Sequence, residues 1–250
     1  RCDQKFRINA EFSDLCPMNQ PEKKNVVYFP NLDGLRFFCF FAVFLYHAFA
    51  TDVASIKSNP WYQLIEGKLV SSGHLGVNCF FVLSGFLITY LLLHEQKISG
   101  NIDIRSFYVR RILRIWPMFY ACVLFGFVGF PMLKQAFGQT PAETANLLYF
   151  LTFTNNFDMV YNGPPDASVL TILWSVAIEE QFYLLWPVIL SVVPIPHYPK
   201  VFAAIIAQSL LYRIYCETQY SGIQLMQQLD HHTLSCIGDM AMGAWGAWMV

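Results

Sequence analysis

The longest uncharged apolar stretch of this chain, residues 73–93, has 21 residues and no Asp, Glu, Lys or Arg. A helix needs about 20 mostly apolar residues to cross the hydrocarbon core of a bilayer. Charged residues make up only 13% of the 250 residues, whereas a soluble domain carries about 25%. We therefore expect an integral membrane protein whose partner is the lipid bilayer. The net charge of −1 excludes a nucleic-acid binder driven by charge.

Several other stretches are long and apolar enough to predict helices, so the expected fold class is an all-α polytopic transmembrane bundle. The other predicted spans are residues 35–53, 115–133, 169–193, 201–216 and 233–250. Residues 147–157 are apolar but too short to cross, and they predict a re-entrant or interfacial segment. Residues 1–30 are polar and predict a cytoplasmic lead, followed by a membrane domain over residues 31–250. The chain begins at Arg1 and ends in an apolar run, so we expect it to be part of a longer protein.

The distribution of Lys and Arg predicts the orientation of these spans, because cytoplasmic loops carry an excess of both. With the N-terminus inside, the inner segments hold 11 basic residues and the outer loops hold 3. We therefore expect a multi-pass protein of the plasma or inner membrane with a cytoplasmic N-terminus.

Few ionisable side chains fall inside the predicted spans, and each is a functional hypothesis because charge is costly in a bilayer. Arg36 and His47 are separated by close to three helical turns, so they share one face about 16 Å apart along the axis. With Arg36 at the inner boundary, His47 is expected near the middle of the membrane. A histidine there can act as a base near neutral pH. The alternative is a structural histidine bonded to a neighbouring helix.

A second group lies in the span predicted at residues 169–193. Ser175, Glu179 and Tyr183 recur at every fourth position and therefore share a face. Counting from the outer end places Glu179 about 15 Å deep, the depth expected for His47. We expect Glu179 to orient that histidine or a substrate hydroxyl; a hydrogen bond that only packs helices is the alternative. Glu180 points about 100° away and is not expected to serve the same site.

A basic cluster precedes the span predicted at residues 115–133. It reflects either the positive-inside rule alone or a phosphate site at the inner face, because arginine forks match phosphate oxygens. The cluster consists of Arg105, Arg110, Arg111 and Arg114.

Other polar and small residues are expected to be structural. Asp239 is flanked by small residues that allow close approach of helices, and Arg213 is expected near the outer surface. Seven cysteines without a CxxC pair suggest neither a zinc site nor a disulfide framework, and no metal is expected. Tight helix packing is predicted at Gly73, Gly76, Ser84 and Gly85.

Four segments, taken in order, resemble the motifs of the membrane-bound acyltransferase family 3. Residues 32–47 contain an arginine followed, after ten residues, by a histidine. Residues 76–88 resemble the family's second-span signature, residues 107–117 its inner arginine motif and residues 174–184 its glutamate motif. Each motif is moderately specific alone, and the four in this order are highly specific.

The resemblance implies a domain of about ten spans, of which this chain holds a part. It implies acetyl-CoA or another acyl-CoA as a cytoplasmic donor, and an extracytoplasmic glycan such as O-antigen, exopolysaccharide or peptidoglycan as acceptor. We therefore expect an O-acyltransferase. The expected site residues are His47, Glu179 and Arg36 for catalysis, and Arg110, Arg111 and Arg114 for the phosphates of the donor.

Two other classes of protein fit part of the pattern. A proton-coupled secondary transporter or exporter can use a buried histidine and glutamate as a proton relay, although the sequence contains no internal repeat. A non-catalytic membrane scaffold would tolerate the loss of these charged residues. A measurement of acyl-CoA binding distinguishes the acyltransferase, the transporter and the scaffold.

Overall fold

The computed structural model describes residues 30–49, 51, 53–68 and 73–250. The chain divides into two units, residues 1–30 and residues 31–250, and the description concerns the second. The lead predicted at residues 1–30 lies outside the described residues except for its last position. Within the described part every regular element is a helix, as the apolar pattern predicts.

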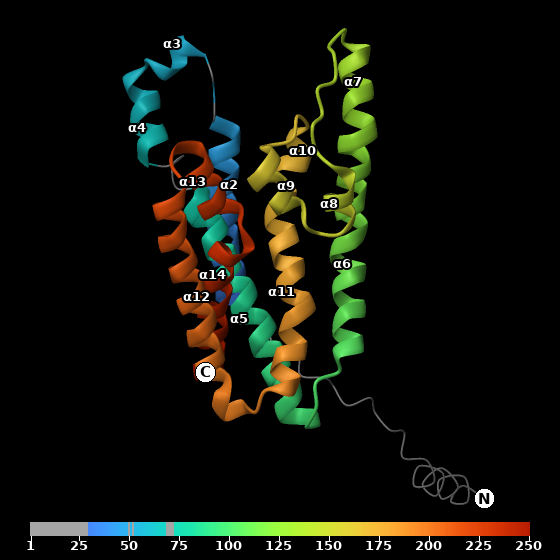
Figure 1. Cartoon of the computed structure of the whole chain (residues 1–250), viewed down its shortest axis with the longest axis vertical. Coiled ribbons are helices and arrows are strands. Elements are labelled where there is room, and N and C mark those ends of the chain that lie inside the picture. Colours follow the sequence, from blue (N-terminus) through green and yellow to red (C-terminus); the bar gives the residue numbers. More distant parts are fainter. Residues whose placement is uncertain (1–29, 50, 52, 69–72) are drawn as a thin grey trace, which may run out of the picture. The chain divides into compact units, whose positions relative to one another are not determined.

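The longer helices form the bundle, and shorter elements connect them (Figure 1). They are α2 (Pro30–Phe49), α5 (Gly73–Ser99), α6 (Ile104–Leu124), α11 (Leu173–Val192), α12 (Tyr198–Gln219) and α14 (Thr233–Met249). Shorter elements are α3 (Ala54–Lys57), α4 (Pro60–Lys68), α7 (Phe130–Ala136), α8 (Leu147–Leu151), α9 (Asn155–Asn162), α10 (Ser168–Thr171) and α13 (Gly222–His231), with a π turn η2 (Phe125–Gly129) and a 3-10 turn η3 (Ile195–His197).

Three helical segments of the described chain are long and apolar enough to cross a membrane. They are Gly73–Ser99, Ile104–Ala136 and Ser168–Val192, and Gly34–Phe49 is a shorter apolar helix. The three long segments lie at the spans predicted at residues 73–93, 115–133 and 169–193, whereas the apolar helix Gly34–Phe49 is shorter than the span predicted at residues 35–53. Helices α12 and α14 form at the other two predicted positions without meeting the same criterion of length and hydropathy.

The helix that carries the basic cluster begins earlier than predicted. The Asp103 side chain accepts a hydrogen bond from the Ser106 N–H at 3.0 Å and caps α6, as acidic residues commonly do at helix N-termini. The helix therefore begins 11 residues before the span predicted to start at residue 115, because a capped polar turn precedes the apolar run. The arginines lie on the helix itself, and α6 continues through η2 into α7.

The apolar segment at residues 147–157 forms two short helices, α8 and α9, and no spanning helix. Phe153 stands between them with a φ of 54°, in the left-handed region that breaks a helix. The buried side chains of Phe150 and Phe153 pack with Phe119 of α6. The break therefore anchors the loop against α6.

Glycines let α5 pack closely against two neighbours, as the sequence predicts. A Cβ at Gly73 would lie 2.5 Å from the Tyr46 Cβ, and a Cβ at Gly76 would lie 2.8 Å from the Cys39 carbonyl oxygen of α2. On another face, a Cβ at Gly85 would overlap the backbone of α14, and a Cβ at Gly243 would overlap the backbone of α5. These contacts fix how α2 and α14 are placed along α5.

Arg213 and Asp239 have structural surroundings. The Arg213 guanidinium donates two hydrogen bonds to the Ser235 carbonyl, at 3.2 and 3.0 Å. Beside Asp239, a Cβ at Gly238 would lie 2.7 Å from the Ser209 hydroxyl of α12. Small residues thus bring α12 and α14 together, as predicted around Asp239.

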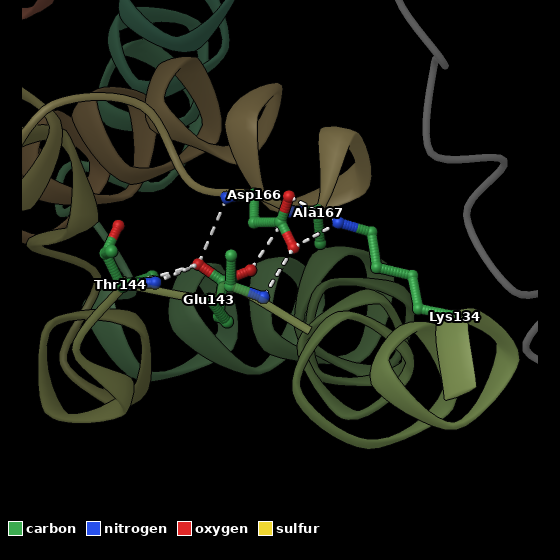
Figure 2. A network of polar contacts seen from close by, with 7 residues as sticks. Lys134, Glu143, Thr144, Asp166 and Ala167 are labelled. Atoms are coloured by element: carbon green, nitrogen blue, oxygen red, sulfur yellow. Dashed lines mark hydrogen bonds and ion pairs between the residues drawn. The ribbon is translucent and has the colours of Figure 1, made fainter. Parts of the chain in front are cut away.

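Two carboxylates hold the loop after α7 against the turn before α10 (Figure 2). The Lys134 ammonium donates to both Asp166 oxygens, at 2.6 and 2.5 Å. This ammonium and the Ala142 N–H hold the pKa of Asp166 below its ordinary value of 3.8. The Glu143 carboxylate accepts from four backbone N–H groups, including that of Ala167 at 3.0 Å. The turn that leads into α10 and α11 is therefore fixed.

The crossing of α5 and α14 gives a stability prediction. We expect Gly243→Ala to lower the free energy of unfolding by about 1–3 kcal/mol, because the added methyl meets the Val82 carbonyl and the Phe86 N–H, which cannot move without separating the helices. Gly246→Ala is the matched control on the same helix. Its Cβ would lie 3.7 Å from the Phe86 ring, and alanine favours a helix by up to about 1 kcal/mol.

The measurement is the thermal unfolding midpoint of each detergent-solubilised variant. Equal midpoints for Gly243→Ala and Gly246→Ala would contradict the packing argument.

Candidate active site

The ends of several helices enclose a cavity of about 640 Å³. His47 comes from the last turn of α2, His74 from the first turn of α5, and His231 from the end of α13. Trp174 and Glu179 contribute from α11. The cavity therefore brings together His47 and Glu179, which the sequence singles out separately, and two histidines that it does not.

His47 and Glu179 lie at different levels of this cavity, and the prediction of a common depth is wrong. Tyr46, next to His47, contacts Gly73 at the start of α5, whereas Glu179 is bonded to Ser84, eleven residues further along. That separation is about 16 Å along the helix. The physical reason is that α2 ends at Phe49, so that His47 lies in its last turn, beside the N-terminal end of α5.

Arg36 is on the same helix as His47. Its side chain is half-buried, and Arg36 is not among the described residues that line the cavity. Arg36 therefore lies eleven residues before His47 on α2, about 16 Å along the helix axis.

Two hydroxyl groups hold the Glu179 carboxylate. The Ser84 hydroxyl donates to Oε1 at 2.6 Å, and the Tyr183 hydroxyl donates to Oε2 at 3.3 Å. Ser84 has the second role of hydrogen-bond donor in addition to the predicted packing role. Such bonds offset the cost of burying a carboxylate, and they fix the Glu179 side chain between α5 and α11.

The neighbouring Glu180 faces α6, as its place on the helix predicts. Its Oε2 accepts a hydrogen bond from the Trp116 indole N–H at 3.0 Å. Tyr183 follows Glu180 by about one turn of α11, and the Arg111 guanidinium of α6 lies 5.3 Å from the centre of its ring, within the range of a cation–π contact. The same arginine lies 5.6 Å from the centre of the Phe107 ring, so that it is held between two aromatic rings.

The arginines of α6 have different surroundings. Arg110 is 61% exposed and forms an ion pair at 3.8 Å with Glu95 of α5, whereas Arg111 is directed toward α11. Arg110, Arg111 and Arg114 nevertheless line one small cavity of about 190 Å³, with Glu95 in its wall. Arg105 is exposed and is not among the described residues lining this cavity.

A third space shares lining residues with both the arginine cavity and the histidine cavity. Arg114 also lines a groove of about 300 Å³ between α6 and α11, and Glu179 lines the same groove. Glu179 lines the 640 Å³ cavity as well, so each of the three spaces shares a wall residue with the next. Chemically, the arginines can bind an anionic group at one end, and an imidazole can accept a proton at the other.

Ser84, His74, His231 and Trp174 belong to the site without being singled out as site residues by the sequence. Serine is common at tight helix contacts, and nothing in the spacing of the two histidines relates them to His47. A hydrogen-bonding role for Ser84 could be found only from its register against Glu179.

Comparisons with known proteins give a consistent result. A family profile described as an acyltransferase domain matches residues 29–227. The chain is 34% identical over 173 residues to "Putative peptidoglycan O-acetyltransferase YrhL" of Bacillus subtilis, a match that covers 66% of this chain and 24% of that protein. It is 32% identical over 170 residues to "O-acetyltransferase OatA" of Staphylococcus aureus, covering 66% of this chain and 25% of that protein.

The chain thus spans about a quarter of the length of the curated relatives that it matches. No solved structure matches it.

The bond between Ser84 and Glu179 gives a second stability prediction. We expect Ser84→Ala to destabilise the protein by about 1–3 kcal/mol, because a buried acceptor loses its shorter hydrogen bond. Ser191→Ala is the matched control, since that exposed hydroxyl bonds only to the Val188 carbonyl of its own helix and its loss costs within about 0.5 kcal/mol. Unfolding in detergent measures both, and equal losses would show that the bond does not stabilise the bundle.

Proposed function

We propose, since the chain belongs to the acyltransferase family whose profile matches residues 29–227, that it is the membrane part of an O-acyltransferase. The reaction moves an acyl group, in the first instance acetyl, from cytoplasmic acyl-CoA to a hydroxyl of an extracytoplasmic glycan. The observation that carries this proposal is that the arginine cavity, the groove between α6 and α11 and the cavity of His47 share Arg114 and Glu179 as wall residues. The relatives named for O-acetyl transfer, one of them to peptidoglycan, support the acyl group and the acceptor class.

The proposed topology has a cytoplasmic N-terminus, six spans within residues 31–250 and further spans elsewhere in the protein. It rests on the excess of Lys and Arg in the inner segments. In this orientation α5 runs inward and α6 runs outward, so the arginine cavity faces the cytoplasm and the histidine cavity faces outward. A charged donor and an external acceptor can then reach one site from opposite sides.

The donor is held first by its phosphates. Arg110, Arg111 and Arg114 line one cavity, and guanidinium groups form charge-assisted hydrogen bonds to phosphate oxygens. Arg36, which lies on the inner half of α2 in this orientation, contributes positive charge to the same side. The pantetheine arm then follows the groove between α6 and α11. Glu179, at the junction with the outer cavity, accepts a hydrogen bond from an amide N–H of that arm.

His47 then acts as the general base. Its imidazole removes the proton of the acceptor hydroxyl while the hydroxyl oxygen attacks the thioester carbonyl. The carbon–sulfur bond breaks, and the imidazolium returns the proton to the departing thiolate of CoA. In a variant of this scheme His47 accepts the acyl group first and passes it to the hydroxyl. Family membership favours these schemes over a proton-coupled transporter.

The decisive test of the reaction is the variant His47→Ala in membranes that contain the full-length protein. We expect transfer of labelled acetyl groups from acetyl-CoA to endogenous glycan to fall by about 100-fold or more, which is the usual contribution of a general base. His197→Ala is the control, because that exposed histidine lies in η3 at the other end of α11. Near-normal transfer by His47→Ala at equal membrane abundance would overturn the mechanism.

The donor site gives a separate kinetic prediction. We expect Arg114→Gln to raise the KM for acetyl-CoA by about tenfold, the equivalent of 1.4 kcal/mol, with little change in the KM for the glycan. Arg105→Gln removes the same amount of inner positive charge but from an arginine outside the cavity, and we expect it to leave both values unchanged. If both variants behaved alike, the arginines would have only a topological role.

A further inference from the structure

The histidine cavity of about 640 Å³ contains two histidines that take no part in the proposed reaction, His74 and His231. His74 is 47% exposed and lies 3.8 Å from an Asp230 oxygen, measured from its Nδ1. The Tyr46 ring contacts both imidazoles on this side, with centroids 5.1 Å from His47 and 5.5 Å from His74. The proposed base and this second pair therefore line the same opening.

The position of His231 is fixed by a hydrogen-bond network behind it. The Asn156 amide donates to the His231 carbonyl at 3.1 Å and to the Thr233 hydroxyl at 3.0 Å. The Gln181 side chain of α11 donates to the Asn156 side-chain oxygen at 2.9 Å and accepts from Thr233 at 2.6 Å. Since Gln181 follows Glu179 by two residues, this network sets the end of α13 relative to the helix that carries the candidate site.

The cavity side of His231 has the composition of a site for an uncharged, hydroxyl-rich group. The imidazole and the Trp174 ring meet at an interplanar angle of 73°, with ring centroids 4.6 Å apart. Burial lowers the pKa of His231, and the nearby Asp230 charge opposes this in part, which favours the neutral imidazole at pH 7. A neutral imidazole has one donor and one acceptor nitrogen, and the Nδ1 of His231 is buried without a hydrogen-bond partner in the described part of the chain.

The wall as a whole is mostly apolar and aromatic. Neither Lys nor Arg is among the described residues that line it, in contrast to the arginine cavity at the other end. A few polar groups on an apolar wall are typical of sites that orient a small neutral ligand. An anionic acceptor would find no opposite charge in this lining.

We propose that His74 and His231 form the acceptor subsite, which binds the hydroxyl groups of a neutral sugar ring and directs one of them to His47. Asp230 positions His74, and the network of Asn156, Gln181 and Thr233 positions His231. Trp174 supplies the apolar face on which the ring lies. This assignment rests on the proposed function, and it makes the two histidines determinants of acceptor specificity without a part in the chemical step.

The experiment compares two acceptors in membranes that contain the full-length protein and acetyl-CoA. One is a soluble oligomer of N-acetylglucosamine, and the other is glycerol, which offers hydroxyls without a sugar ring. We expect the double variant His74→Ala/His231→Ala to lower kcat/KM for the oligomer by about tenfold or more, mainly through KM, since each lost hydrogen bond weakens binding. We expect the KM for acetyl-CoA and the rate of glycerol acetylation to stay within about twofold.

Two further variants separate recognition from folding. His231→Gln keeps a donor and an acceptor and should recover part of the oligomer activity, whereas His231→Leu should not. His197→Ala is the histidine control outside the cavity. Equal losses with both acceptors, or no loss with either, would overturn the subsite. Absence of transfer to either acceptor by the unmodified protein would instead overturn the proposed function, and the subsite with it.

Discussion

The arrangement of the other helices depends on three successive polar residues in the middle of α11, Glu179, Glu180 and Gln181. A carboxylate or indole N–H in an apolar interior must find a partner or incur a cost of several kcal/mol. Glu179 finds its partner on α5, Glu180 on α6, and Gln181 on α9. Three successive residues therefore bind three different elements. The bonds that hold the bundle together also fix the site, because α11 cannot rotate without breaking the bonds that these three residues make to α5, α6 and α9.

This dependence explains which features the sequence predicts. Apolar length predicts the helices that are able to cross a membrane, and the four-residue spacing places Ser175, Glu179 and Tyr183 on one face. These features depend on one segment at a time. The structure gives Glu179 its hydroxyl partners on that face and directs Glu180 away toward Trp116. Periodicity within a helix is sufficient for such predictions.

Features that depend on two segments could not be predicted in the same way. The level of His47 along α5 is set by the contact of Tyr46 with Gly73. Counting residues from the end of an apolar run cannot show this contact, because it involves a second helix. The division of the arginines, one toward Glu95 and one between aromatic rings, depends on the neighbours that α6 meets. His231 lies far from His47 in the sequence, and contacts such as the network around Asn156 bring it to the cavity.

The arginine cavity and the histidine cavity differ in the charge of the residues that line them. This difference suits the proposed reaction, in which the donor and the acceptor approach from opposite sides of the membrane. Arginines concentrate at one end and neutral or aromatic groups at the other, so an anionic donor and an uncharged acceptor are each favoured at a different end. In the proposed reaction only the thin, weakly polar arm of the donor needs to pass the region around Glu179, where a bulky charged group would be costly. Under that proposal the bundle can remain packed during the reaction, because the charge of the donor stays at one face and the sugar stays at the other.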